Sequence, residues 1–79
     1  MKYAVLFEKT ETGYSAHLPD LPGCVAAGSS LEETTGLIRG AISLHIAGMV
    51  EDGEPLPEPK TVAEYIELPS HFVQNEPKV

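Results

Sequence analysis

The stretch that decides the fold is residues 14–33, which read YSAHLPDLPGCVAAGSSLEE. Residues 14–18 alternate between two faces, with tyrosine, alanine and leucine on one and serine and histidine on the other, as expected for a half-buried strand. Two prolines in the next four residues end this strand, because proline donates no backbone hydrogen bond to a sheet. Residues 24–28 then favour a second short strand.

A capping box follows at the end of this stretch. The Ser30 hydroxyl can accept a hydrogen bond from the Glu33 N–H, and the Glu33 side chain can reach back to the Ser30 N–H. The pattern predicts a helix from Leu31 to about Asp52, with Gly53 just beyond its end. The apolar arc of this helix covers half of its surface or more, which is wider than one sheet usually requires. The arc contains Leu31, Ile38, Ile42, His45 and Met49, flanked by Leu37, Ala41 and Leu44.

Upstream, residues 2–8 favour a strand, because Tyr3, Val5 and Phe7 alternate onto one face. Residues 9–13 form a turn ending in glycine, so this strand and residues 14–18 are expected to make a β-hairpin.

Downstream of the helix, every second residue from 55 to 59 is proline, which predicts an extended segment that carries the chain back toward the sheet. Residues 63–68 favour either a fourth, edge strand or a short helical turn.

These elements predict an α+β domain with the order β-β-β-α-β, in which one long helix packs on a small, mostly antiparallel sheet of three or four strands. The domain is expected to span residues 1–69, and residues 70–79 are expected to form a flexible tail.

With 79 residues the chain is marginal as an independent domain, because so short a chain buries only roughly 60% of its surface. Its single cysteine, Cys24, excludes an internal disulfide, so self-association or a second protein is the expected source of further stability. The net charge of −7 argues against direct nucleic-acid binding and suits a basic partner. The sequence contains no signal peptide or membrane-spanning stretch, so a cytoplasmic location is expected.

The sequence offers little for catalysis or for metal binding, and no cofactor is expected. Cys24 and His17 fall on neighbouring strands, but no cation or helix N-terminus lies beside Cys24 to activate it. His17, His45 and His71 lack the spacing of metal ligands. The strand carboxylates form no convergent cluster of the kind that a metal-dependent nuclease needs.

Two features leave alternatives open. Gly36, Gly40 and Gly48 lie inside the predicted helix; the first two, with Ser43 and Ala47, form a strip of small residues that is either a solvated face or a site of close backbone approach. Acidic residues gather around both helix ends and the proline segment, where they are either ordinary solvated charge or a surface for a basic partner.

Three motifs in order resemble the HicB family of antitoxins from type II toxin–antitoxin modules. They are Pro19-Asp20-Leu21-Pro22-Gly23, the helix start Ser30-x-Glu32-Glu33, and Asp52-Gly53-Glu54 followed by the proline segment. Together they cover roughly residues 3–68.

The resemblance implies a partial, degenerate ribonuclease-H-like domain that acts by binding and not by catalysis. It implies a HicA-like partner, a small basic toxin that cleaves mRNA, whose active site the antitoxin covers. It also implies a homo-oligomer, a dimer or a tetramer. We expect the partner to contact Asp20, Leu21 and Pro22 of the loop and Glu51, Asp52 and Glu54 at the helix end.

The sequence departs from the family pattern at two places. Many such antitoxins carry a C-terminal DNA-binding module, for which the residues after Pro69 leave no room, so no direct nucleic-acid binding is expected. Thr34, Thr35 and Gly36 stand where the family commonly has alanine-rich helix formers. The alternative function is a homo-oligomeric binding module with the antitoxin fold but without a toxin.

Overall fold

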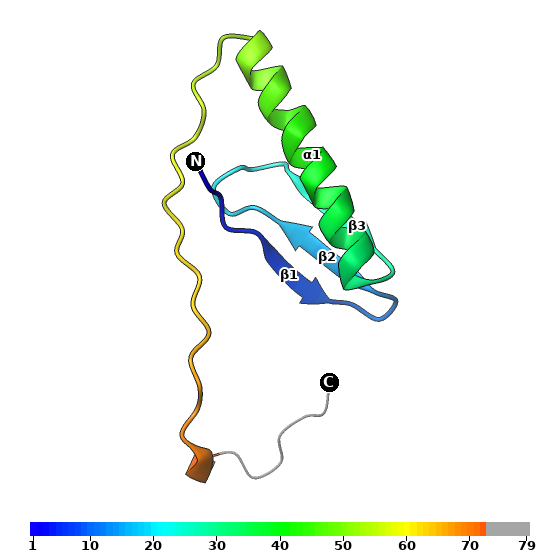
Figure 1. Ribbon diagram of the computed structural model, residues 1–79, viewed down its shortest axis with the longest axis vertical. Helices are drawn as coiled ribbons and strands as arrows, with labels where there is room; N and C mark the ends of the chain where they lie inside the picture. The colour runs from blue at the N-terminus through cyan, green and yellow to red at the C-terminus, as the bar shows by residue number, and fades with distance from the viewer. Residues whose placement is uncertain (73–79) are drawn as a thin grey trace.

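A computed structural model of the chain describes residues 1–72 and shows a three-stranded antiparallel sheet beneath one long helix (Figure 1). In chain order the elements are β1 (Leu6–Lys9), β2 (Tyr14–His17), β3 (Val25–Gly28), α1 (Leu31–Glu51) and the short 3-10 helix η1 (Ser70–Phe72). The expected α+β class is therefore confirmed. Neither helix in the described part of the chain is long and apolar enough to cross a bilayer.

The strands are paired in their sequence order, β1-β2-β3, and Ala16 lies opposite both Phe7 and Ala26. β1 is shorter than the predicted strand of residues 2–8, because its pairing with β2 begins at Leu6, opposite His17. After His17 the chain turns away from β1, so residues 2–5 have no strand partner on that side.

The connection from β2 to β3 is a tight loop that is closed by its own backbone. Leu21 N–H donates to Leu18 O (3.2 Å) and Cys24 N–H donates to Leu21 O (3.1 Å). Gly23 has a positive φ of 87°, a conformation that L side chains rarely adopt. The Pro-Asp-Leu-Pro-Gly motif is therefore a rigid turn and not a mobile link.

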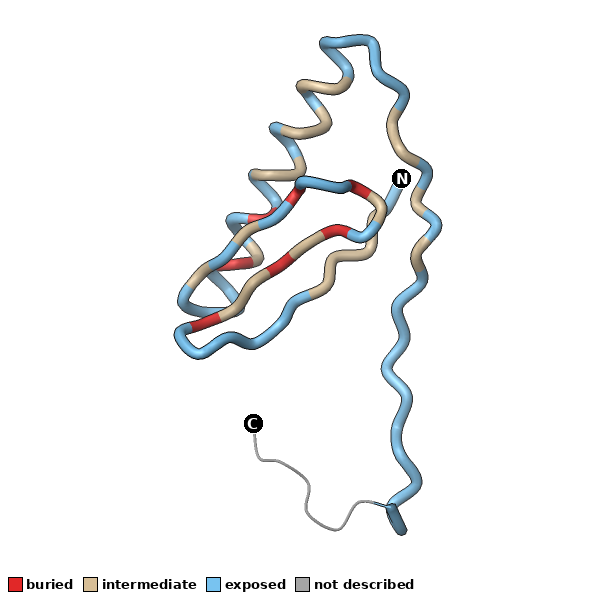
Figure 2. The backbone as a smooth tube through the Cα atoms, turned by 180° about the vertical axis from the view of Figure 1, so that it is seen from behind, coloured by how far each residue is buried: buried red, intermediate tan, exposed pale blue. Residues whose placement is uncertain are grey.

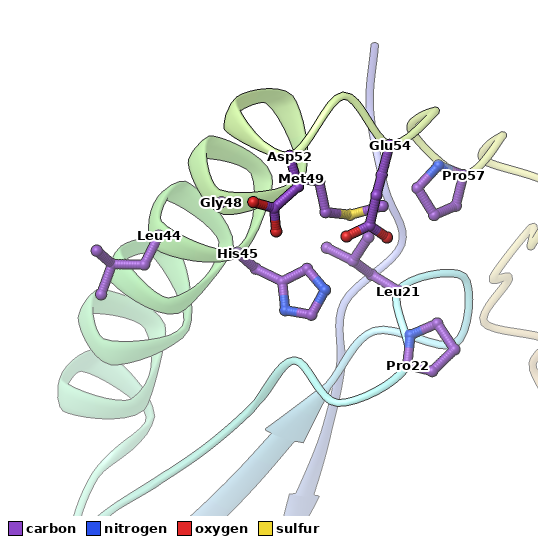
Figure 3. Close-up of a pocket in the computed structure, with 9 residues that line it drawn as sticks. All are labelled: Leu21, Pro22, Leu44, His45, Gly48, Met49, Asp52, Glu54 and Pro57. Atoms are coloured by element: carbon purple, nitrogen blue, oxygen red, sulfur yellow. The ribbon is translucent and has the colours of Figure 1, made fainter.

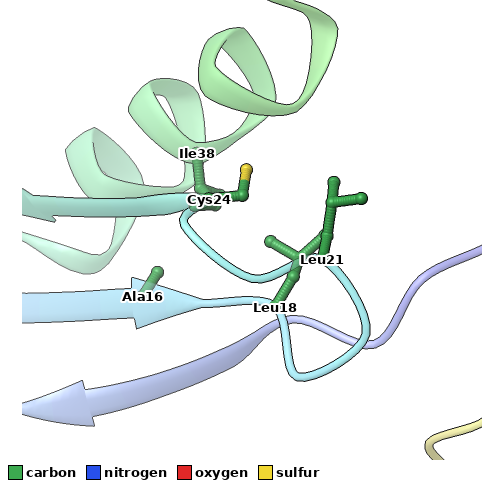
Figure 4. Close-up of a cluster of buried hydrophobic side chains, with 5 residues drawn as sticks. All are labelled: Ala16, Leu18, Leu21, Cys24 and Ile38. Carbon is green, nitrogen blue, oxygen red and sulfur yellow. The ribbon is translucent and has the colours of Figure 1, made fainter. Parts of the chain in front are cut away.

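Five hydrophobic residues form the buried core between the helix and the sheet (Figure 4). They are Ala16, Leu18, Leu21, Cys24 and Ile38, and Leu21 is fully buried. Partly buried side chains from the N-terminal segment, β3 and α1 pack around them: Tyr3, Val5, Ala26, Ala41, Ile42, Ile46 and Met49. Cys24 is a small member of this core and is 2% exposed.

The predicted start of α1 at Leu31 is confirmed, and its capping bonds differ from the prediction in one partner. The Ser30 hydroxyl accepts a hydrogen bond from Glu33 N–H (3.0 Å), as expected. The Glu33 carboxylate, however, accepts from the N–H (3.1 Å) and the hydroxyl of Ser29, one residue earlier than predicted. These bonds to Ser29 lower the pKa of the Glu33 carboxyl.

The packing of Thr34 accounts for one of the three unusual residues, Thr34, Thr35 and Gly36, near the start of α1. Its side chain is fully buried, and its hydroxyl donates to Ser30 O (2.7 Å). It packs so closely on β3 that a Cβ added to Gly28 would lie 2.7 Å from the Thr34 Oγ1. Threonine at this position fits a helix that approaches the glycine of β3 closely. At Gly36, in contrast, an added Cβ would meet no atom of another part of the chain within 4 Å.

The sheet covers only part of the apolar arc of α1, which packs against β2 and β3. Ile38 is buried, whereas Leu37 and Leu44 at the margins of the arc are exposed. The arc is thus wider than this sheet can cover.

The predicted fourth strand, residues 63–68, is not present in the sheet of this chain, and these residues form no helical turn either. Residues 54–69 have no regular secondary structure and follow an extended course that leaves the domain (Figures 1 and 2). The domain boundary at residue 69 stays a prediction. Of the predicted tail, Ser70–Phe72 form η1, and residues 73–79 lie outside the described residues.

Candidate partner-binding site

An open hollow of about 460 Å³ lies where the end of α1 meets the β2–β3 loop and the proline segment (Figure 3). The β2–β3 loop and the chain from the end of α1 into the proline segment, which are distant from each other in sequence, supply its lining. The lining residues are Leu21, Pro22, Leu44, His45, Gly48, Met49, Asp52, Glu54 and Pro57.

The spacing of the helix residues places a histidine, a methionine and a carboxylate on one side of α1. His45, Met49 and Asp52 are separated by four and then three residues, so they form one stripe along the helix. In Figure 3 the His45 ring extends from the helix toward the loop that holds Leu21 and Pro22. A Cβ at Gly23 would lie 3.9 Å from the His45 Cε1, so the ring packs against the glycine of this loop.

The end of the helix brings a second carboxylate to the hollow. Gly53 has a φ of 71°, and Glu54 N–H donates to Met49 O (2.9 Å), which turns the chain sharply after Asp52. Gly53 therefore terminates the helix as predicted. The turn places the carboxylates of Asp52 and Glu54 on the same side as His45 (Figure 3).

The charge at this end of α1 is opposite to what helix stability favours. The C-terminal end of a helix carries partial negative charge and prefers basic side chains. The last turn of α1 contains no basic residue, and Glu51, Asp52 and Glu54 are all acidic. The site therefore has an apolar floor, which Leu21 and Met49 provide, beneath an acidic rim.

Asp20 lies on the loop beside the hollow, and its carboxylate binds residues 60 and 61 of the same chain. One carboxylate oxygen accepts hydrogen bonds from Lys60 N–H (2.9 Å) and Thr61 N–H (2.8 Å), and the other accepts from the Thr61 hydroxyl (2.8 Å). The bond from Thr61 N–H is the main cause of a lowered pKa for the Asp20 carboxyl. A second contact, from the Tyr3 hydroxyl to Pro57 O (2.5 Å), holds the same segment against the N-terminus.

The structure brings together four of the six residues that the sequence predicts as contacts: Leu21, Pro22, Asp52 and Glu54. Leu21 is fully buried and supports the floor, whereas Pro22 is exposed. Asp20 instead fixes the segment that leaves the domain, and Glu51 does not line the hollow.

Sequence reasoning missed five lining residues: Leu44, His45, Gly48, Met49 and Pro57. The helical spacing of His45, Met49 and Asp52 could have revealed two of them, whereas nothing local marks Pro57. His45, which the sequence places in the apolar arc of the helix, is half-buried at the edge of the hollow.

The described residues contain no group of three His, Cys, Asp or Glu side chains that could hold a metal ion. Burial raises the pKa of the Cys24 thiol, which disfavours the reactive thiolate form. The apolar floor and the acidic rim of the hollow suit a side chain that has both an apolar and a cationic part.

Comparison with known proteins identifies the class of protein that carries this fold. The family of HicB-like antitoxins of bacterial toxin–antitoxin systems matches residues 3–74. The chain belongs to this family, as the three sequence motifs predicted.

Two individual relatives match most of the chain, and the first of them is a HicB antitoxin. The chain is 32% identical over 71 residues to antitoxin HicB 2 of Photorhabdus laumondii, covering 89% of this chain and 51% of the relative. It is 42% identical over 71 residues to a 14.9 kDa protein from the rep-hol intergenic region of Haemophilus phage HP1, covering 90% of this chain and 53% of the relative. The chain thus spans about half the length of these two curated relatives.

A solved structure shares the fold. A chain of a HicA3 and HicB3 toxin–antitoxin complex matches with a TM-score of 0.64 and 30% sequence identity, over 76% of this chain and 70% of that chain.

Proposed function

We propose that the protein is an antitoxin that binds a small, basic HicA-type toxin and blocks its mRNA-cleaving activity by covering it. Membership of the HicB-like family and the likeness to a chain of a toxin–antitoxin complex support this role. The observation that carries the proposal is the acidic rim at the C-terminal end of α1, where charge opposes the helix dipole and a cationic partner would relieve that opposition. The protein acts in the cytoplasm, as a binder and not as an enzyme, and binds no nucleic acid directly.

The contact surface is the hollow and its rim. A lysine or arginine of the toxin would lay its aliphatic stem over Met49 and Pro57 and place its cation beside Asp52 and Glu54. Glu51, which is exposed and precedes Asp52 in the sequence, does not line the site but adds long-range attraction for the basic toxin. Asp20 contributes indirectly, because it holds the segment that forms one wall of the hollow.

We further propose that the domain, residues 1–69, is a partial ribonuclease-H-like fold and that it self-associates as a dimer or a tetramer. The order β-β-β-α supports the first statement. The small core and the exposed margins of the helix arc support the second.

Co-expression of this chain with the small basic protein encoded beside it tests the toxin-binding role. We expect the two to co-purify, and we expect the complex to cleave RNA more slowly than the basic protein alone. If the chain purifies alone as a defined oligomer and leaves the RNA cleavage unchanged, the toxin-free binding module replaces this proposal.

A further inference from the structure

The most exposed apolar part of the described chain is the segment Val62–Phe72, which we call the C-terminal arm. Every residue of the arm is exposed, and Figure 2 shows it projecting from the domain. Its large apolar side chains are almost fully accessible: Tyr65 is 105% exposed and Ile66 is 84% exposed. Val62, Leu68 and Phe72 are exposed as well. Apolar side chains concentrated in one extended segment indicate a surface that another chain covers.

The direction of the arm is fixed at its base. The Asp20 carboxylate holds the backbone N–H groups of Lys60 and Thr61, and the Tyr3 hydroxyl holds Pro57. The alternating prolines before these contacts keep the chain extended. Residues 60–68 contain no glycine, proline, asparagine, aspartate or serine, which are the residues that favour chain reversal. The arm therefore leaves the domain on a stiff base, diverging from β1 (Figure 1).

The sheet offers an open acceptor for such a segment. β1 is an outer strand of the order β1-β2-β3, so its other edge presents unpaired backbone groups. The helix packs on β2 and β3, and Phe7 on β1 remains 36% exposed. Residues 3–9 and residues 62–68 have the same length, about 23 Å when extended. Val62, Ile66 and Leu68 fall on one face of the arm and could cover Phe7 and Val5.

We propose that the arm of one copy pairs as an additional strand with the free edge of β1 in a second copy, and that the second copy returns its arm in the same way. Such a reciprocal exchange closes a two-fold dimer and covers the β1 edge of both sheets. The inference rests on the self-association proposed above and does not depend on the toxin.

The surface area of the chain agrees with this arrangement. The chain exposes 6551 Å², whereas a compact protein of 8.5 kDa exposes about 4,650 Å². The excess of about 1,900 Å² exceeds the roughly 800 Å² that one partner buries in a standard interface. Its radius of gyration is 15.8 Å, compared with about 11.6 Å for a compact domain of 79 residues.

Cysteine crosslinking of the full chain, purified without a toxin, tests the exchange. One sample mixes two single variants, Phe7→Cys and Ile66→Cys, after they have been unfolded and refolded together. A second sample contains the double variant F7C/I66C alone, and Glu64→Cys replaces I66C in a parallel series to allow for the pairing register. Cys24 stays in place, because burial and a raised pKa make its thiol the least reactive.

We expect mild oxidation to crosslink the mixed single variants into covalent dimers. We also expect the native mass of the unmodified chain to be twice 8.5 kDa. An internal disulfide in the double variant, with no crosslink between the mixed variants, would show that the arm closes on its own sheet and would overturn the proposal. A monomeric mass at every concentration would overturn it as well.

A pair of lysine variants distinguishes the arm from other exposed apolar residues. Ile66→Lys should raise the concentration at which the dimer half-dissociates by at least about tenfold, because each arm loses a buried side chain. Val50→Lys makes the same change in net charge as Ile66→Lys, at a 62% exposed position on α1. It should leave the half-dissociation concentration of the dimer unchanged. Equal effects of both variants would contradict the exchange. Because the experiment contains no toxin, its failure would leave the toxin-binding proposal untouched.

Discussion

Leu21 is the residue that holds the β2–β3 loop to the rest of the domain. It is 0% exposed, belongs to the core beneath the helix and forms part of the floor of the hollow. Replacement by alanine would leave a cavity in a core of five residues, so we expect Leu21→Ala to lower the free energy of unfolding by about 2–4 kcal/mol. Urea denaturation measures this change.

Leu44→Ala is the matched control for Leu21. Leu44 also lines the hollow but is 79% exposed, so the same substitution should change stability by less than about 0.5 kcal/mol. Similar losses for the two variants would mean that Leu21 has no special role in the core.

Asp20 makes the base of the arm sensitive to pH. Its carboxylate accepts the N–H groups of Lys60 and Thr61, and these bonds lower its pKa below the ordinary value. The contribution to stability is therefore complete above about pH 4, where the unfolded-state carboxyl ionises, and is lost as the pH falls through the lower folded-state pKa. We expect hydrogen-exchange protection of both amides at pH 7 and its loss under strongly acidic conditions.

Asp20→Ala should abolish the protection of the Lys60 and Thr61 amides at every pH. The Ser29 amide, which the Glu33 carboxylate holds, gives an internal control, because it should stay protected in this variant. If the amides at residues 60 and 61 remain protected in Asp20→Ala, the carboxylate does not hold the arm.

At the scale of the elements, α1 contains a glycine, Gly40, at which there is room for a larger side chain. A Cβ added to Gly40 would meet no atom within 4 Å, so Gly40→Ala should stabilise the protein by about 0.5–1 kcal/mol through helix propensity alone. Thermal unfolding at one fixed protein concentration measures the gain.

Gly13→Ala should destabilise the protein, because its Cβ would lie 2.0 Å from Gly28 O.

Gly40→Ala also decides between the two interpretations of the small-residue strip. If the strip is a solvated face, the native mass of the variant stays that of the original chain. If another backbone approaches it closely, the added methyl group weakens self-association.

The elements that the sequence predicted well are those that local rules determine. The alternating side chains before Pro19 defined β2, and Ser30 and Gly53 defined the ends of α1 within one residue. Residues 63–68 were ambiguous, because a strand also needs an edge to pair with, and no local pattern says whether that edge belongs to the same chain. The hollow was predicted in part, since its acidic rim is contiguous in sequence whereas Pro57 reaches it only through the course of the backbone.

At the scale of the whole molecule, the net charge of −7 governs how a basic partner approaches. Asp52 and Glu54 lie together at the rim, so neutralising both in Asp52→Asn/Glu54→Gln should slow association with the basic toxin by at least about threefold at low salt. The salt dependence of the association rate should also become shallower. Stopped-flow mixing at several salt concentrations measures both effects.

Glu8→Gln/Glu11→Gln is the matched control, because it removes the same net charge from β1 and the hairpin turn, away from the hollow. If only the net charge matters, the two double variants will associate with the toxin equally slowly. A local docking site would slow the rim variant more than this control and would raise the dissociation rate of the rim variant alone, because the toxin's cation would lose its partners after docking as well as before it. Glu51→Gln, outside the lining, should change the association rate and leave the dissociation rate unchanged. Equal association and dissociation rates for the two double variants would exclude the end of α1 as the docking site.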